Sequence, residues 1–138
     1  VDYEDRINEF AKQHAGPKGE VAVVAINSNR IPADSLANMQ KRAKEKGFTF
    51  PYVFDESQET AKAYGATRTP EFFVLNAERK IVYMGAMDDN SDAAKVTVRY
   101  LEPAVEAALK GTVPAVKETA PIGCGIRFAR QRRDSRKD

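Results

Sequence analysis

The stretch Tyr64–Met84 constrains the fold of this chain most strongly, because it places a proline directly before the most apolar strand pattern in the sequence. A helix-like segment ends at Gly65, Thr69-Pro70 follows, and a polar turn separates the apolar runs Phe72–Leu75 and Ile81–Met84. Two such runs around a short turn predict an antiparallel hairpin. Proline cannot donate a hydrogen bond to a sheet ladder, so we expect Pro70 at the first residue of a strand or on a sheet edge.

The rest of the chain alternates between helix-like and strand-like patterns. Apolar residues spaced by three and four indicate helices, and short runs rich in β-branched and aromatic residues indicate strands. The elements expected in addition to the hairpin are helices over residues 3–15, Leu36–Lys46, Gln58–Tyr64 and Thr97–Lys110, and strands over Val21–Ile26 and Phe50–Phe54. This alternation predicts parallel pairing with helices on both faces, to which the hairpin adds an antiparallel strand. The predicted fold class is α/β, with a mixed sheet flanked by helices and an extended C-terminal arm.

Two segments carry more specific expectations about their place in the fold. Val21–Ile26 is a continuous apolar run, which is typical of a central strand covered on both faces. The run Phe50–Phe54 contains Pro51, so we expect it to be an edge strand. Pro103 is awkward in the last helix, because an interior proline costs about 3 kcal/mol. That helix therefore either begins late, with Pro103 in its first turn, or kinks at Pro103.

Length and charge limit the classes of function. The chain has 138 residues, which fits one domain, and it contains no apolar run long enough to span a membrane. From Arg127 to Asp138 it has six basic and two acidic residues, whereas the remainder has a slight excess of acidic residues. Only the tail Arg127–Lys137 gives a reason to consider nucleic acid or another anionic partner. We expect this tail to be disordered.

The sequence has one cysteine, Cys124, and one histidine, His14. This pair excludes an intrachain disulfide and a Cys/His zinc site. An acidic loop offers oxygen ligands, but its spacing fits no EF-hand, so we expect loop and helix-capping roles from Asp88, Asp89, Asn90 and Asp92. Cys124 stands between two glycines, where it is either an accessible thiol or a small side chain packed against the domain.

Several segments, in their order and spacing, resemble redoxin-domain proteins of the alkyl hydroperoxide reductase and thiol-specific antioxidant group. These segments are Tyr3–Arg6, Ala25–Asn29, Phe50–Glu56, Ala63–Ala66, Thr69–Phe73, Asp88–Asn90 and Pro121–Ile126. The resemblance implies a thioredoxin-like fold with a redoxin domain over residues 1–111, an extended arm over 112–126 and the basic tail over 127–138. It also implies that the family's first strand and its Cys-Pro motif lie before Val1.

The resemblance implies a thiol–disulfide oxidoreductase or thiol peroxidase acting on a protein thiol or disulfide, or on a peroxide. It implies no metal or organic cofactor. The nucleophile would be a low-pKa cysteine at the start of the first helix, where the helix terminus favours the thiolate. Pro70 would be cis, and Thr69 and Pro70 would position an extended partner strand. Cys124 would attack the sulfenate or disulfide formed at the nucleophile.

Alternatives stay open at this point. Arg68, just before Thr69-Pro70, either lowers a thiol's pKa or holds an anionic partner, or it is a solvated charge. The alternative to an enzyme is a binding or scaffold module that keeps the fold without the chemistry. A third hypothesis is an anion-binding accessory domain acting through Arg127–Lys137. Substrate, electron donor, compartment and oligomeric state do not follow from the sequence.

Overall fold

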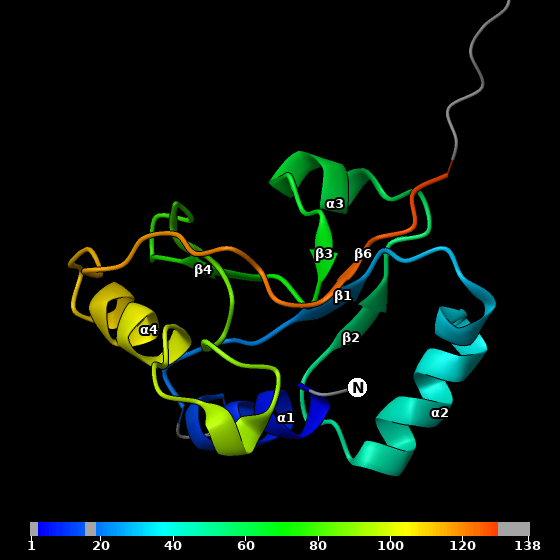
Figure 1. Cartoon of the computed structure of the whole chain (residues 1–138), viewed down its shortest axis with the longest axis horizontal. Helices are drawn as coiled ribbons and strands as arrows, with labels where there is room; N and C mark the ends of the chain where they lie inside the picture. Colours follow the sequence, from blue (N-terminus) through cyan, green and yellow to red (C-terminus); the bar gives the residue numbers. More distant parts are fainter. Residues whose placement is uncertain (1–2, 16–18, 130–138) are drawn as a thin grey trace, which may run out of the picture.

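The computed structural model describes residues 3–15 and 19–129 of the chain (Figure 1). Its elements in chain order are α1 (Glu4–His14), β1 (Ala25–Asn27), η1 (Pro32–Asp34), α2 (Leu36–Lys46), β2 (Tyr52–Phe54), α3 (Glu59–Tyr64), β3 (Arg68–Thr69), β4 (Phe72–Leu75), β5 (Ile81–Gly85), η2 (Ala93–Lys95), α4 (Leu101–Leu109) and β6 (Cys124–Gly125). The α/β class and the order of elements agree with the sequence-based prediction. The tail was expected to be disordered over residues 127–138, but its first three residues are described, and Arg127 and Ala129 are hydrogen-bonded to Asn29 and Gln58. The tail from residue 130 onward lies outside the described residues, and its disorder stays a prediction.

The strands form three two-stranded ladders. β1 and β2 pair in parallel, β4 and β5 form the predicted antiparallel hairpin, and β3 pairs antiparallel with β6 from the C-terminal arm. Figure 1 shows the arm running along the hairpin and then reaching the region of β1 and β3. Among the described residues, the strands therefore do not join into the one continuous mixed sheet that the alternating pattern predicted.

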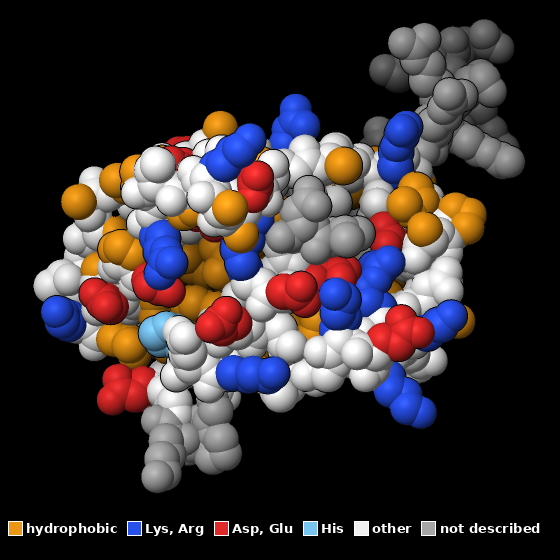
Figure 2. Space-filling model, turned by 60° about the horizontal axis from the view of Figure 1, so that its bottom comes forward, with side chains coloured by type: hydrophobic (Ala, Val, Ile, Leu, Met, Phe, Trp, Pro, Cys, Tyr) orange, Lys and Arg blue, Asp and Glu red, His pale blue; other side chains and the backbone are white. Residues whose placement is uncertain are grey.

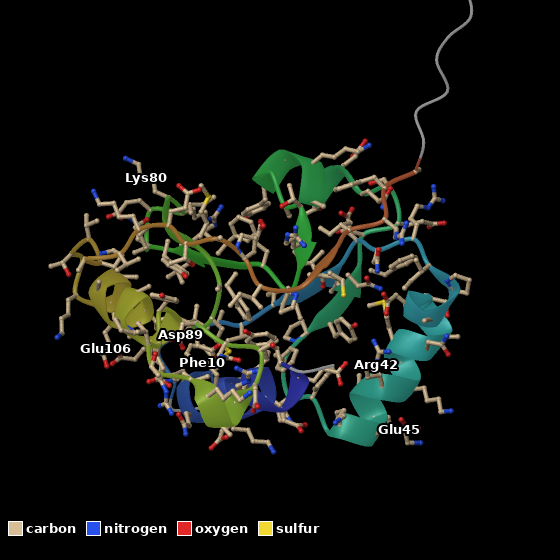
Figure 3. All side chains as sticks on the ribbon, in the orientation of Figure 1. Phe10, Arg42, Glu45, Lys80, Asp89 and Glu106 are labelled. Carbon is tan, nitrogen blue, oxygen red and sulfur yellow. The ribbon has the colours of Figure 1, made fainter. Side chains whose placement is uncertain are left out.

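The core lies between the hairpin and two helices. Its buried members are Phe10, Val74, Tyr83, Leu101, Ala104 and Val105. α4 contacts both β4 and β5, and Figure 3 shows Phe10 on α1 close to α4. Burial of these side chains holds the hairpin in place, and the hairpin in turn fixes where Pro70 lies.

One of the two expectations about strand segments needs correction. Val21–Ile26 was expected to be a central strand, but β1 begins only at Ala25, and Val21 and Val23 instead pack against the core. Ile26 is 46% exposed and its register partner Val53 is 44% exposed, so this face of the β1–β2 ladder is open to solvent. The edge position predicted for β2 agrees with the structure, since β2 pairs with β1 alone among the described strands.

The last helix begins later than Thr97. α4 starts at Leu101, so Pro103 lies in its first turn, and the late-start alternative is correct. The first N–H groups of a helix have no partner within the helix, so a proline there removes no hydrogen bond. The segment before α4 forms the short helix η2, which Asp92 caps by accepting from the backbone N–H of Ala94.

Ionic contacts tie α2 to the rest of the fold. Arg42 Nε lies 3.3 Å from a carboxylate oxygen of Glu4 in α1, and Arg42 Nη1 lies 3.3 Å from one of Asp34. Figure 3 shows Arg42 on the side of α2 that faces α1, whereas Glu45 points outward. On the face shown in Figure 2, basic and acidic side chains are interspersed and form no large area of one sign. Among the described residues, none of the helices is long and apolar enough to cross a bilayer.

Candidate functional site

The candidate site is centred on the link between β3 and β4. The Thr69–Pro70 peptide bond is cis, and β4 begins two residues after Pro70. Tyr3, which directly precedes α1, has its ring centroid 6.4 Å from that of Phe72. The fold therefore places the beginning of α1 close to the Pro70 segment, which is where the resemblance implies a reactive cysteine.

The C-terminal arm returns to this same place. β6 pairs antiparallel with β3 in a register that sets Cys124 opposite Thr69 and Gly125 opposite Arg68. The Cys124 side chain is exposed, so the alternative of a small residue packed against the domain is wrong. Three of the four residues singled out from the sequence as site residues thus share one ladder, and Pro70 follows it directly.

Gly123 and Arg68 show how closely the arm approaches. A Cβ at Gly123 would lie 2.1 Å from the carbonyl oxygen of Thr69, well inside any real contact, so only glycine fits here without movement. The exposed Arg68 side chain donates from Nη1 to the Gly123 carbonyl oxygen at 3.0 Å. The arginine contacts the arm, and its proposed effect on a thiol stays a prediction.

Two amide side chains hold the end of the arm. The backbone N–H of Arg127 donates to Asn29 Oδ1 at 2.7 Å, and that of Ala129 donates to Gln58 Oε1 at 2.9 Å. Gln58 Nε2 donates to the Arg127 carbonyl oxygen at 2.8 Å. Neither Asn29 nor Gln58 was expected at the site from the sequence, because each lies far from the arm along the chain.

The family can be judged with this geometry in view. A model of the Redoxin family matches residues 4–101 of the chain. The chain belongs to the Redoxin family. A comparison with curated proteins gives no match at the threshold applied.

Two solved structures are similar to this redoxin domain. A hypothetical protein from Sinorhizobium meliloti 1021 is 39% identical with a TM-score of 0.81, and the match covers 92% of this chain and 71% of that one. An uncharacterized conserved protein from Geobacillus kaustophilus is 38% identical with a TM-score of 0.84, with 94% of this chain and 70% of that one covered. Both likenesses extend beyond the fold to the sequence, and together with the family match they confirm the redoxin, thioredoxin-like assignment.

In this redoxin domain, the side chains of Asn29 and Gln58 that bind the end of the arm are themselves buried. Gln58 is 1% exposed and has a left-handed φ of 63°, and its Nε2 also donates to the Ser28 carbonyl oxygen at 2.7 Å. Asp55 accepts from Ser28 Oγ at 2.7 Å and from the Ala61 backbone N–H at 3.2 Å. Desolvation opposes the charge on Asp55, but these hydrogen bonds outweigh it and lower the pKa of this carboxyl. Asp55 thereby orients the turn that carries Gln58.

The beginning of α1 is held by a buried acidic residue of the loop after β5. Asp88 is 4% exposed; Arg6 Nη1 donates to its Oδ2 at 2.6 Å, and the Tyr3 hydroxyl donates to its Oδ1 at 3.0 Å. The Arg6 guanidinium lies 3.8 Å from the centroid of the Tyr3 ring. Burial, together with the hydrogen bond and the charge of Asp88, raises the pKa of Tyr3 to about 12. This cluster fixes the first turn of α1 relative to Pro70.

The acidic loop thus has the structural roles expected of it. Asp88 pairs with Arg6, Asp92 caps η2, and Asp89 accepts from the backbone N–H of Thr97 at 2.9 Å. The described part of the redoxin domain contains no group of three or more side chains arranged to hold a metal ion.

Proposed function

We propose that this chain is the redoxin domain of a thiol–disulfide oxidoreductase or thiol peroxidase, with the nucleophilic cysteine upstream of Val1 and Cys124 as the resolving thiol. The observation that supports this most strongly is the register of β3 and β6, which places the exposed Cys124 opposite Thr69 and beside Pro70. The proximity of Tyr3 to Phe72 supports it too, because a cysteine at the start of α1 would lie near the same segment. A helix N-terminus lowers the pKa of such a thiol.

In the peroxidase form of the proposal, the upstream thiolate attacks a peroxide oxygen. One oxygen becomes the sulfenic acid, and the other leaves as an alcohol or water after taking up a proton. Cys124 then attacks the sulfenic sulfur, forming a disulfide and releasing water. In the oxidoreductase form, the thiolate attacks a partner's disulfide, and Cys124 displaces the partner as a thiolate from the mixed disulfide. In both forms an external dithiol returns the domain to its reduced state.

The proposed roles of the remaining site residues follow from their positions. Thr69 and Pro70 position the partner, since β3 presents its backbone groups at the edge that β6 occupies. Arg68 holds the arm through the Gly123 carbonyl oxygen, and its charge favours an anionic sulfur nearby.

The test uses the full-length protein with the segment that precedes Val1. Peroxide is added, and mass spectrometry follows the oxidation state of each cysteine. We expect a disulfide between Cys124 and the upstream cysteine in the wild type. In a Cys124→Ser variant we expect a sulfenic acid that dimedone traps. Absence of a Cys-Pro motif upstream, or oxidation that never involves Cys124, would contradict the proposal.

The second candidate is a binding or scaffold module without thiol chemistry. Two observations favour it: the chain's own arm already occupies the edge at β3, and the sequence contains one cysteine. The module predicts peptide or protein binding that is unaffected by Cys124→Ser and that consumes no thiol. The enzyme predicts that this substitution stops turnover.

A further inference from the structure

The arm is bound through its backbone. Beyond the β3–β6 ladder, the Ile126 N–H donates to the Thr67 carbonyl oxygen at 2.9 Å, and the Arg30 N–H donates to the Arg127 carbonyl oxygen at 3.3 Å. Asn29 and Gln58 add three further hydrogen bonds to the backbone of residues 127 and 129. From Ile126 to Ala129, four backbone groups of the arm thus meet partners from three separate segments of the domain. A strand added to an exposed edge in this way is a recurring mode of peptide recognition.

The side chains of the arm contribute much less. From Gly123 to Ala129 every residue is exposed except Ile126, which is half-buried. The domain therefore binds the arm mainly through its backbone groups and much less through its side chains. A site of this kind accepts any extended segment whose side chains do not collide with it.

Such a collision can occur at one position. Opposite the Thr69 carbonyl, the arm has Gly123, where a Cβ would lie 2.1 Å from that oxygen. At Gly125, two residues further on, a Cβ would meet no atom within 4 Å. The site therefore selects for glycine at one position and tolerates side chains at the other.

The geometry points to a peptide-binding site formed by Thr67–Thr69, Asn29 and Gln58, which takes an extended polypeptide with glycine opposite the Thr69 carbonyl. We propose that the chain's own segment Gly123–Ala129 is its resident occupant, and that an external extended segment binds only by displacing it. The proposal rests on the proposed function in one respect, since the displaced partner strand would be the redox substrate. The binding itself requires no thiol.

Displacement has a measurable consequence. An external peptide can bind only to molecules whose arm has left the site. The apparent dissociation constant of that peptide is therefore the intrinsic constant divided by the fraction of molecules with an open site. Loosening the arm without altering the site should therefore tighten the binding of an external peptide. Damaging the site should release the arm and yet abolish peptide binding.

The experiment uses the chain of 138 residues and a fluorescent synthetic peptide with the sequence of residues 119–129 carrying Cys124→Ser, which cannot form a disulfide. Fluorescence anisotropy measures its dissociation constant. We expect Gly123→Ala, whose new Cβ collides with Thr69, to bind the peptide about tenfold or more tighter than the wild type. Gly125→Ala is the matched control, and we expect it to bind like the wild type. A peptide that itself carries Gly123→Ala should lose about tenfold or more in affinity for the loosened chain.

A second variant tests the site. Gln58→Glu keeps the shape of the side chain but removes the amide N–H groups that donate to Ser28 and Arg127. Hydrogen exchange at the amides of Ile126, Arg127 and Ala129 should accelerate in both Gly123→Ala and Gln58→Glu. Only Gly123→Ala should gain peptide binding.

Three results would overturn the proposal. The first is equal peptide affinity of the Gly123→Ala and Gly125→Ala chains, and the second is equal binding of a scrambled peptide. The third is unchanged exchange at the arm amides in both Gly123→Ala and Gln58→Glu. Because the peptide has no thiol, its binding can succeed where the cysteine assays of the full-length protein fail, and the converse also holds. The two proposals therefore fail separately.

Discussion

Asp88 shows how one buried charge positions a helix. Asp88 is 4% exposed, and its carboxylate lies between Arg6 and Tyr3 at the beginning of α1. In the sequence Asp88 follows Arg6 by 82 positions and Tyr3 by 85 positions. Removing one partner of a buried ion pair leaves the other charge poorly compensated, which is costlier than losing an exposed pair. Arg6 keeps the Asn90 carbonyl oxygen at 2.9 Å when the carboxylate is lost, so the damage is partial.

We expect Asp88→Asn to lower the free energy of unfolding by about 3 kcal/mol. Urea denaturation measures this, with Asp92→Asn as the matched control. Asp92 is an exposed cap, and asparagine caps about as well as aspartate, so the control should stay within about 0.5 kcal/mol of the wild type. Equal losses of stability in the two variants would show that Asp88 contributes no more to the fold than the exposed Asp92.

Tyr3 gives a pH signature to the same cluster. The pKa of Tyr3 is raised to about 12 in the folded state, mainly by burial, from the ordinary tyrosine value of 10.0. Between these values the unfolded chain loses the proton while the folded chain keeps it, so stability falls as pH rises through this range. We expect the stability difference between the wild type and Tyr3→Phe to be largest below pH 10 and to narrow toward pH 12. Denaturation curves over this range measure it, and a constant difference would contradict the assignment.

At the scale of elements, the arm is attached at two separate ladders. Before reaching β3 it pairs with β5, where the Met84 N–H donates to the Lys117 carbonyl oxygen and the Thr119 N–H donates to the Met84 carbonyl oxygen, both at 3.1 Å. Thr119 Oγ1 also accepts from the Ala86 N–H at 2.9 Å and lies 2.7 Å from the hydroxyl of the fully buried Tyr83. The arm therefore forms part of the hairpin's hydrogen-bonding system.

We expect Thr119→Val to destabilise the domain by about 1–3 kcal/mol, because it leaves the Ala86 N–H without its acceptor and removes a partner of the Tyr83 hydroxyl. Thr112→Val is the control: its hydroxyl donates to the Ala107 carbonyl oxygen at an exposed site, where water replaces the lost bond. Thermal or urea denaturation compares the two. A loss of stability in Thr112→Val but not in Thr119→Val would show that Thr119 does not anchor the arm to the hairpin.

At the scale of the whole molecule, the described strands remain in separate ladders and leave apolar side chains on an open face. Ile26 and Val53 lie opposite each other there, 46% and 44% exposed. Among the described strands β1 pairs only with β2, so this ladder stays two strands wide and the face with Ile26 and Val53 stays open.

We expect Val53→Thr to change the stability of this chain by less than about 1 kcal/mol, whereas Val74→Thr, at 8% exposure, should cost about 2 kcal/mol. Denaturation at two protein concentrations measures both. A large, concentration-dependent effect of Val53→Thr would show that a second copy covers the face in solution.

Much of the candidate site was named from the sequence, but its assembly was not. Thr69, Pro70, Arg68 and Cys124 were identified through the redoxin resemblance, and the hairpin followed from local patterns. Gln58 was missed, because the sequence predicted it as the first residue of a helix; in the structure it lies just before α3 with a left-handed φ. Asn29 looked like an ordinary loop residue.

The sequence by itself determined the helices, the hairpin and the late start of α4 as one of two options, because apolar periodicity, caps and proline act over a few neighbouring residues. Only the tertiary structure decided that the arm lies on β3, that Cys124 faces Thr69 and that Gln58 holds a segment 69 residues away. These pairings depend on which backbone N–H and carbonyl groups remain unpaired once the core has formed, and no local pattern encodes that.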